Sequence, residues 1–225
     1  MKLLALAVLI ASLGLTGCQN PVRDPIDSVV QIVTDPKKEI KKGTRQYPFA
    51  LAQSGGDLTQ LPLTTAYLNG RIQRLATTAN SPFPWGIRLV NDGSINAWAV
   101  PGGKMGVKYG LLTEVDTEAE LVSVLGHEMA HSIELHGTGR ETFGTLVGLA
   151  AQVIEIGISE PGTKPGSNKL IGLGQNILMG QYSQSNELEA DRVGVDVMAR
   201  AGFDPRGAVG MQEKLAKLGS GGNSI

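Results

Sequence analysis

Two histidines and a glutamate lie together in the segment His127–His131, which reads His-Glu-Met-Ala-His. On an α-helix with about 3.6 residues per turn, residues four apart lie one above the other, so both imidazoles would project from one face. That spacing suits two ligands of a single Zn²⁺, and Glu128 beside the first ligand could act as general base on the water of the metal. Zinc lowers the pKa of such a water to about 7. The motif therefore predicts metal-assisted hydrolysis.

The flanking sequence predicts that this motif lies on a helix. Thr117 and Glu120 match a T-x-x-E capping box, in which Thr117 accepts from the first turn and Glu120 reaches back to the N–H of the cap. Gly137 is a natural stop at the other end. Apolar positions between them indicate a largely buried helix: Leu121, Val124, Leu125, Ile133 and Leu135. Because so short a motif also occurs by accident, with packed or solvated histidines, other segments must decide.

A third ligand is needed, because catalytic zinc sites use three protein ligands and a water. The helical stretch 186–196 offers carboxylates. Glu187 and Asp191 are four apart and share a face, whereas Glu189 points elsewhere. We expect Glu187 to be the third ligand and Asp191 to accept the N–H of a ligand histidine. The alternative is an ordinary acidic helix face in contact with solvent.

Segments upstream of the motif predict a small sheet. Apolar runs at 87–90, 95–100 and 105–111 are typical of strands, and Pro101 with two glycines predicts a hairpin closed by a type II turn. The segment from Asn96 to Val100 is the candidate edge strand above the metal helix, where extended substrate would pair through its main chain. An ordinary core strand with Trp98 buried is the alternative.

The other segments predict helices, so the expected fold class is α+β, mostly helical with a small mixed sheet. The stretch 142–158 is apolar, and we expect a buried helix or lid there in preference to a membrane span, followed by a flexible loop over 160–169. A last helix is expected over 207–218. An amphipathic helix is expected over 61–79, with its apolar face formed by Leu63, Ala66, Tyr67, Ile72 and Leu75.

The N-terminus has the pattern of a lipoprotein leader. Lys2 precedes a short apolar run, and Leu15-Thr16-Gly17-Cys18 then resembles the bacterial lipobox, whose cysteine is lipidated after cleavage. We expect residues 1–17 to be the signal peptide and Cys18, the only cysteine, to carry lipid. Gln19 stands where an aspartate would signal inner-membrane retention, so outer membrane facing the periplasm is expected in a Gram-negative cell. An ordinary signal peptide is the alternative.

The rest of the chain is expected to divide into a lipidated tether and N-terminal helix over 18–56, a metallopeptidase domain over 57–218 and a tail over 219–225. With 225 residues, 41% hydrophobic residues and a net charge of -1, one globular core is expected, and nothing points to nucleic acid. The basic run 37–42 could touch anionic lipid, although a solvated helix face is favoured.

Three segments together resemble the HtpX and CAAX-prenyl-protease family of gluzincin zinc metallopeptidases, and within it the BepA/LoiP-like periplasmic quality-control lipoproteins. They are the HEMAH motif, the later E-L-E-A-D of 187–191 and the upstream N-A-W-A-V-P-G-G of 96–103. The similarity covers roughly residues 61 to 218. The resemblance implies a zincin-like fold with zinc bound by His127, His131 and Glu187. It also implies that Glu128 is the general base, that Asp191 accepts the N–H of a ligand histidine, and that Asn96 lies on the strand that pairs with substrate.

There is one departure from the family pattern. The family usually continues past the last helix into a segment with a His-Pro pair and a later arginine near the metal, whereas this sequence ends at Ile225 and has three histidines. His136 is not assigned as a replacement. We therefore expect either a truncated chain or a site without a group that would regulate it or stabilise an oxyanion.

The expected function is zinc-dependent endopeptidase activity on unfolded or misassembled cell-envelope proteins, with outer-membrane assembly machinery as a candidate partner. The main alternative is a chaperone or assembly factor of low turnover on the same metal-binding fold, with the 142–158 segment gripping clients. A purely structural lipoprotein with an accidental motif is a third hypothesis, and it predicts no bound zinc.

Overall fold

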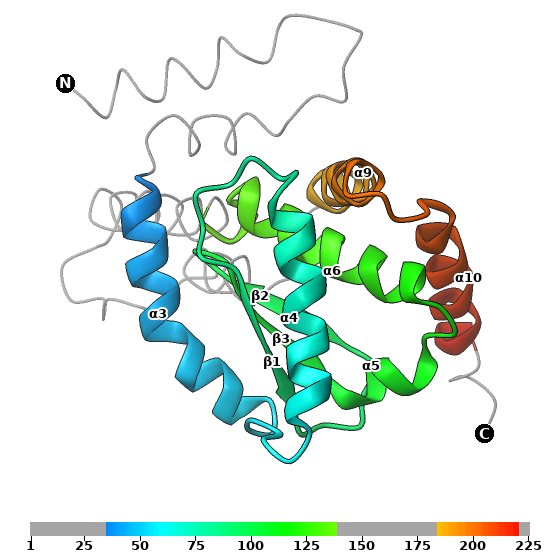
Figure 1. The fold of residues 1–225 in the computed structure, drawn as a ribbon, viewed down its shortest axis with the longest axis horizontal. Helices are drawn as coiled ribbons and strands as arrows, with labels where there is room; N and C mark the ends of the chain where they lie inside the picture. Colours follow the sequence, from blue (N-terminus) through cyan, green and yellow to red (C-terminus); the bar gives the residue numbers. More distant parts are fainter. Residues whose placement is uncertain (1–34, 139–183, 221–225) are drawn as a thin grey trace, which may run out of the picture. The chain divides into compact units, whose positions relative to one another are not determined.

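The computed structural model describes residues 35–138 and 184–220. Cys18, the predicted helix at 142–158, the predicted loop at 160–169 and residues 221–225 lie outside the described residues. The elements in chain order are α3 (Pro36–Gln53), α4 (Pro62–Ala76), β1 (Gly86–Val90), β2 (Ala97–Val100), β3 (Lys104–Lys108), α5 (Tyr109–Glu114), α6 (Glu118–Ile133), α9 (Gln184–Arg200) and α10 (Arg206–Ser220) (Figure 1).

The chain divides into two compact units. One comprises Thr34–Glu134 and Leu188–Ile225, and the other comprises Met1–Val33 and Leu135–Glu187. All elements from α3 to α6, the greater part of α9, and α10 belong to the first unit. Helix α9 carries the chain from one unit into the other within its first turn, after Glu187.

The sheet has three strands in the order β1-β3-β2, with β1 parallel to β3 and β2 antiparallel to it. The predicted hairpin is confirmed, and Gly102 has the positive φ of 77° that the third residue of a type II turn requires. The predicted strand at 105–111 is wrong beyond Lys108, because α5 begins at Tyr109. Lys108 forms an ion pair with Asp92 in the loop between β1 and β2 at 2.8 Å, and the strand ends at this contact. The periodicity of the local sequence does not reveal a contact with a distant loop.

The two edges of this sheet differ. Along β1, the side-chain amide of Asn69 on α4 donates to the Ile87 carbonyl at 2.9 Å and accepts from the Ile87 N–H at 3.0 Å. The Leu58 N–H also donates to the Leu89 carbonyl at 2.8 Å. An amide side chain thus takes the place of a neighbouring strand, and the β1 edge is closed. The other edge is β2, which packs against α6.

Helix α4 forms as predicted, but its buried face is partly wrong. Ile72 and Leu75 are buried together with Leu68, at the helical spacing i, i+4, i+7. Leu63 is 85% exposed, because nine residues correspond to two and a half turns and place it opposite Ile72. Ala66 and Tyr67 are exposed as well. The two bonds of Asn69 to β1 fix this rotation of the helix about its axis.

Helix α6 begins as predicted but ends early. Thr117 caps it by accepting from the Glu120 N–H at 3.2 Å. The Glu120 carboxylate reaches back to this end of the helix: it accepts from the Asp116 N–H at 2.7 Å, and after the hydrogen bond from Lys214, backbone hydrogen bonds from Asp116 and Thr117 lower its pKa. The predicted stop at Gly137 is wrong, because the helix ends at Ile133 and Leu135 has a φ of 58°.

Helix α10 packs along α6 and is joined to its N-terminal end by Lys214. The Lys214 ammonium donates to the Glu114 carbonyl at 2.7 Å, to Asp116 at 2.8 Å and to Glu120 at 2.9 Å. The hydrogen bond from Lys214 is the main cause that lowers the pKa of Glu120, and hydrogen bonds to Asp116 and Glu120 raise the pKa of Lys214. This cluster fixes the start of the motif helix against α10.

We predict that Lys214→Met lowers the thermal unfolding midpoint by about 2 to 4 °C at neutral pH. Because the folded-state pKa of Glu120 is depressed, the stabilisation is complete above the ordinary carboxyl value of 4.5 and is lost as the pH falls through the lower folded value. The difference in midpoint between wild type and variant should therefore shrink below about pH 4. Calorimetry over a pH series measures it.

Arg200→Met is the matched control for this experiment. Arg200 pairs with Asp196 at 2.9 Å on the surface of α9, and both side chains are at least half exposed. Exposed pairs of this kind contribute little to stability, so its midpoint should stay close to that of wild type. Equal losses in both variants would contradict the role given to the cluster around Lys214.

Candidate metal centre

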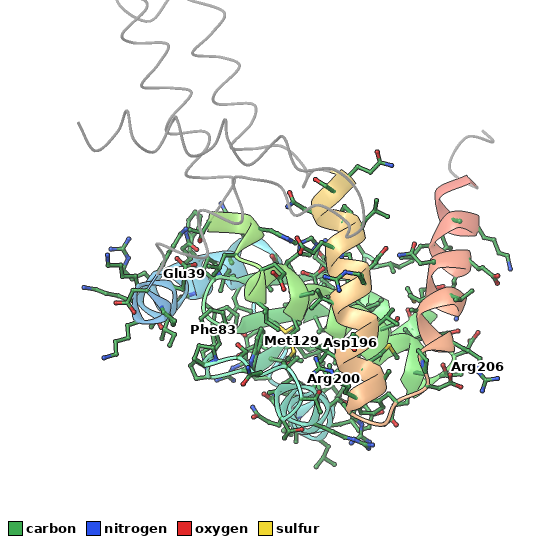
Figure 2. All side chains as sticks on the ribbon, turned by 90° about the horizontal axis from the view of Figure 1, so that it is seen from above. Glu39, Phe83, Met129, Asp196, Arg200 and Arg206 are labelled. Atoms are coloured by element: carbon green, nitrogen blue, oxygen red, sulfur yellow. The ribbon has the colours of Figure 1, made fainter. Side chains whose placement is uncertain are left out.

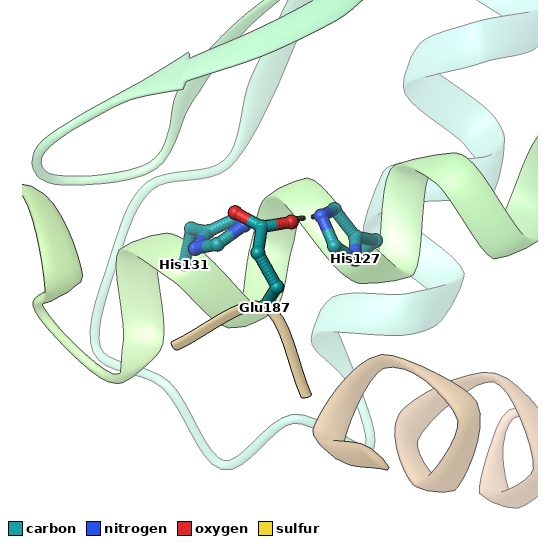
Figure 3. A group of neighbouring side chains, drawn as sticks. All are labelled: His127, His131 and Glu187. Atoms are coloured by element: carbon teal, nitrogen blue, oxygen red, sulfur yellow. Dashed lines mark hydrogen bonds between the residues drawn. The ribbon is translucent and has the colours of Figure 1, made fainter. Parts of the chain in front are cut away.

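Helix α6 directs His127 and His131 to the same side. Their ring centroids lie 4.6 Å apart, and their Nε2 atoms are separated by 3.0 Å (Figure 3). His131 is 4% exposed. On the buried side of the helix, Leu125 and Met129 are completely enclosed, so the core holds the helix in one rotation. The packing of α6 therefore fixes the direction of both imidazoles.

Helix α9 meets α6 at a pair of glycines. A Cβ placed on Gly194 would lie 2.8 Å from the carbonyl carbon of Gly126 and 2.8 Å from the His127 nitrogen. Real Cβ atoms essentially never approach backbone so closely, so the crossing requires glycine. The close approach brings Asp191, one turn before Gly194, to the side of His127.

Asp191 determines which nitrogen of His127 is available. Its Oδ1 atom lies 2.8 Å from His127 Nδ1. When Nδ1–H donates to this carboxylate, the ring lone pair is on Nε2, and this nitrogen faces the Nε2 of His131. This is the arrangement in which a carboxylate orients a metal-binding histidine. The role of Asp191 stays a prediction.

Glu187 lies one turn before Asp191 on α9. The atoms that His127, His131 and Glu187 would offer to a metal all lie within 4.8 Å of one another (Figure 3). Among residues 35–138 and 184–220, this is the group of three such side chains near enough to hold one ion. Ligands of tetrahedral zinc at about 2.0 to 2.2 Å are roughly 3.3 Å apart, close to the separation of the two Nε2 atoms. The residues present therefore fit a metal ion with two imidazoles and one carboxylate.

Glu189 and His136 do not belong to this group of three. Glu189 is buried, and its carboxylate lies 4.0 Å from the guanidinium of Arg192. His136 is 1% exposed and follows the end of α6. Glu128 is half-buried and follows the first ligand on the same helix. Its function as general base is not tested by this geometry and stays a prediction.

Asn96 lies just before β2 and is exposed. Its carbonyl accepts from the Lys108 N–H at 3.0 Å, so it is used inside the hairpin. Because hydrogen-bonded pairs alternate along antiparallel strands, the register directs the backbone groups of Ala97 and Ala99 away from β3, to the outer edge. The outward direction of these two alanines could not be predicted from the sequence, because it depends on the pairing register of β2 with β3. The close contact of Gly126 with Gly194 could not be predicted either, because it depends on the crossing of α6 and α9.

Comparison with known proteins identifies related sequences. The family model described as Peptidase family M48 matches residues 62–220 of this chain. A Beta-barrel assembly-enhancing protease from Yersinia pestis is 37% identical over 69% of this chain and 33% of its own length. The protein of that name from Escherichia coli K12 is 29% identical over 93% of this chain and 45% of its length. Metalloprotease LoiP from Escherichia coli K12 is 29% identical over 100% of this chain and 90% of its length. The chain thus spans less than half of the first two relatives.

We predict that Asp191→Asn weakens zinc binding about 10- to 100-fold, because the variant no longer places a negative charge on His127 Nδ1–H. Competition with a chromophoric chelator measures the dissociation constant. Asp196→Asn is the control, since Asp196 lies on the same helix and pairs with Arg200 at the surface (Figure 2). Equal zinc affinities of the two variants would reject the orienting role of Asp191.

We also predict that Gly194→Ala weakens zinc binding at least about tenfold, because the added Cβ must push α9 away from α6. Gly70→Ala is the matched control: no heavy atom lies within 4 Å of its added Cβ, and alanine in a helix is favoured by about 0.5 to 1 kcal/mol. The control should bind zinc normally and unfold at or slightly above the wild-type temperature. Normal zinc binding by Gly194→Ala would show that the crossing does not position the ligands.

Proposed function

The chain belongs to peptidase family M48, a family of metallopeptidases, and from this membership we propose that it is a zinc endopeptidase of the bacterial cell envelope that cleaves unfolded or misassembled proteins. The observation that carries the proposal is the cluster of His127, His131 and Glu187, with their ligand atoms within 4.8 Å of one another. The 2.8 Å contact of Asp191 with His127 supports it, because catalytic zinc sites of the two-histidine, one-glutamate type use such oriented ligands.

The chemistry is divided between the metal and one carboxylate. When bound, the metal supplies Lewis-acid chemistry: it polarises the peptide carbonyl and makes water acidic enough to ionise near neutral pH. Glu128 takes a proton at its carboxylate and passes it to the nitrogen of the leaving amine. Asp191 holds His127 in the tautomer whose Nε2 can bind metal.

The sheet supports the proposed substrate class. At its β2 edge the strand packs against the motif helix, and the main-chain groups of Ala97 and Ala99 are directed outward. A substrate strand pairing there would be held through its own main chain, with little dependence on its side chains. Only an extended, unfolded segment offers such a strand. Asn69 closes the β1 edge, which leaves β2 as the edge for pairing in the described sheet.

The proposed location is the outer membrane, on the periplasmic face, with lipid on Cys18 as the anchor. The lipobox-like sequence before Cys18 supports this location. Among the helices of the described ranges, none is long and apolar enough to cross a membrane. Relatives named for enhancing β-barrel assembly support the further proposal that outer-membrane assembly machinery is a partner.

A chaperone or assembly factor of low turnover is the second candidate, and the words "assembly-enhancing" in the names of those relatives favour it. It predicts that client proteins are kept soluble by a chain that cannot hydrolyse them. One experiment distinguishes the peptidase from the assembly factor, because only the peptidase needs the carboxylate of Glu128.

We predict that the purified protein cleaves casein, and that Glu128→Gln lowers cleavage at least about 10³-fold while the variant still binds one zinc. A chelator should abolish wild-type cleavage and added zinc should restore it. Glu213→Gln, an exposed position on α10, is the control and should cleave normally. Full cleavage by Glu128→Gln would reject the mechanism. Zinc binding without cleavage by the wild type, together with protection of clients by both proteins, would favour the assembly factor.

A further inference from the structure

Helix α3 has one face fixed against the sheet. It packs against β2 and β3, and a Cβ on Gly43 would lie 1.7 Å from the Pro101 carbonyl oxygen. On the same side, the Tyr47 hydroxyl donates to the Met105 carbonyl at 2.7 Å, and its ring contacts Trp98 edge-on. These contacts leave α3 no freedom to rotate about its axis. The opposite face is therefore permanently the outer face.

This outer face is cationic. We define the outer face as the residues within about 60° of the direction opposite Gly43 that carry charge or an aromatic ring. All of them are exposed, and they are Lys37, Lys38, Lys41, Arg45 and Phe49. The acidic residue of the helix, Glu39, is 4% exposed and lies on the packed side. In Figure 2, nitrogen-tipped side chains project outward from this blue helix. Asp35 before the helix uses its carboxylate to cap the Lys37 N–H at 2.9 Å.

The outer face of α3 is much more positive than the chain as a whole. The whole chain has a net charge of -1, whereas this face carries four cations and no anion. Phe49 follows Arg45 by one turn of the helix and is 65% exposed. A stripe of lysine and arginine that ends in an exposed aromatic ring fits a lipid surface, where the cations meet phosphate groups and the ring enters the headgroup boundary.

The position of α3 in the chain agrees with such a partner. Seventeen residues lie between Cys18 and Pro36, and a chain of that length spans at most about 60 Å. Helix α3 is the first described element after Cys18, so lipid on Cys18 would hold it within that distance of the membrane. We propose that the outer face of α3 docks on a membrane surface rich in anionic phospholipid and thereby orients the protein on the bilayer. The inference is independent of peptidase activity.

Vesicle cosedimentation tests the proposal. The chain from Gln19 onward is used, so that neither the leader nor lipid on Cys18 contributes, and circular dichroism verifies its fold. Binding to vesicles of phosphatidylglycerol and phosphatidylcholine is expected, with little binding to phosphatidylcholine alone and with release at high salt. The variant Lys38→Gln/Lys41→Gln/Arg45→Gln should reduce the partition coefficient about a hundredfold, because each cation near an anionic surface contributes about a factor of five.

The control variant is Arg88→Gln/Arg200→Gln/Arg206→Gln, which removes the same charge from β1, α9 and α10. It should bind vesicles within about twofold of wild type. Phe49→Trp adds a reporter whose emission should shift to the blue on anionic vesicles. Equal losses in the two triple variants, equal binding to neutral vesicles, or retention on heparin with none on vesicles would each overturn the proposal.

Discussion

The contact between Gly126 and Gly194 is the constraint on which the candidate site depends. Two helices from distant parts of the sequence can approach this closely only where neither carries a side chain. The approach determines the direction of α9 relative to α6, and hence the 2.8 Å separation of Asp191 from His127. The approach of Asp191 to His127 is here a consequence of backbone packing.

The sheet provides the second constraint, through the unequal treatment of its edges. Every exposed strand edge offers unpaired N–H and C=O groups to any extended chain. In this protein the side chain of Asn69 satisfies one edge and ties α4 to it. The other edge lies beside the motif helix. One amide side chain on a helix and the short segment around Leu58 thus cover the β1 edge.

Features encoded within a few residues could be predicted from the sequence. The shared face of His127 and His131, the cap at Thr117 and the turn at Gly102 each follow from spacing or from one residue type, and the structure has all three. The fold class of a mostly helical protein with a small mixed sheet followed from the same kind of pattern.

Features that depend on distant partners could not be predicted. The inward face of α4 was misjudged because Asn69 sets its rotation through bonds to β1. The contact of Lys214 on α10 with the Glu120 carboxylate could not be read from the capping-box pattern. The crossing at Gly126 and Gly194 could not be predicted, because a glycine within a helix does not indicate which element packs against it. In each case the missing information was a tertiary contact more than ten residues away.

The wide separation of the site residues in sequence has a consequence for when the protein acquires its chemistry. His127 and Asp191 are 64 residues apart, and Glu187 follows His131 by more than fifty. A chain that emerges from its N-terminus first, during synthesis or translocation, presents both histidines long before either carboxylate. The full set of proposed ligands can assemble only after α9 has emerged and docked. The proposed peptidase would therefore complete its metal site only in the last part of its folding.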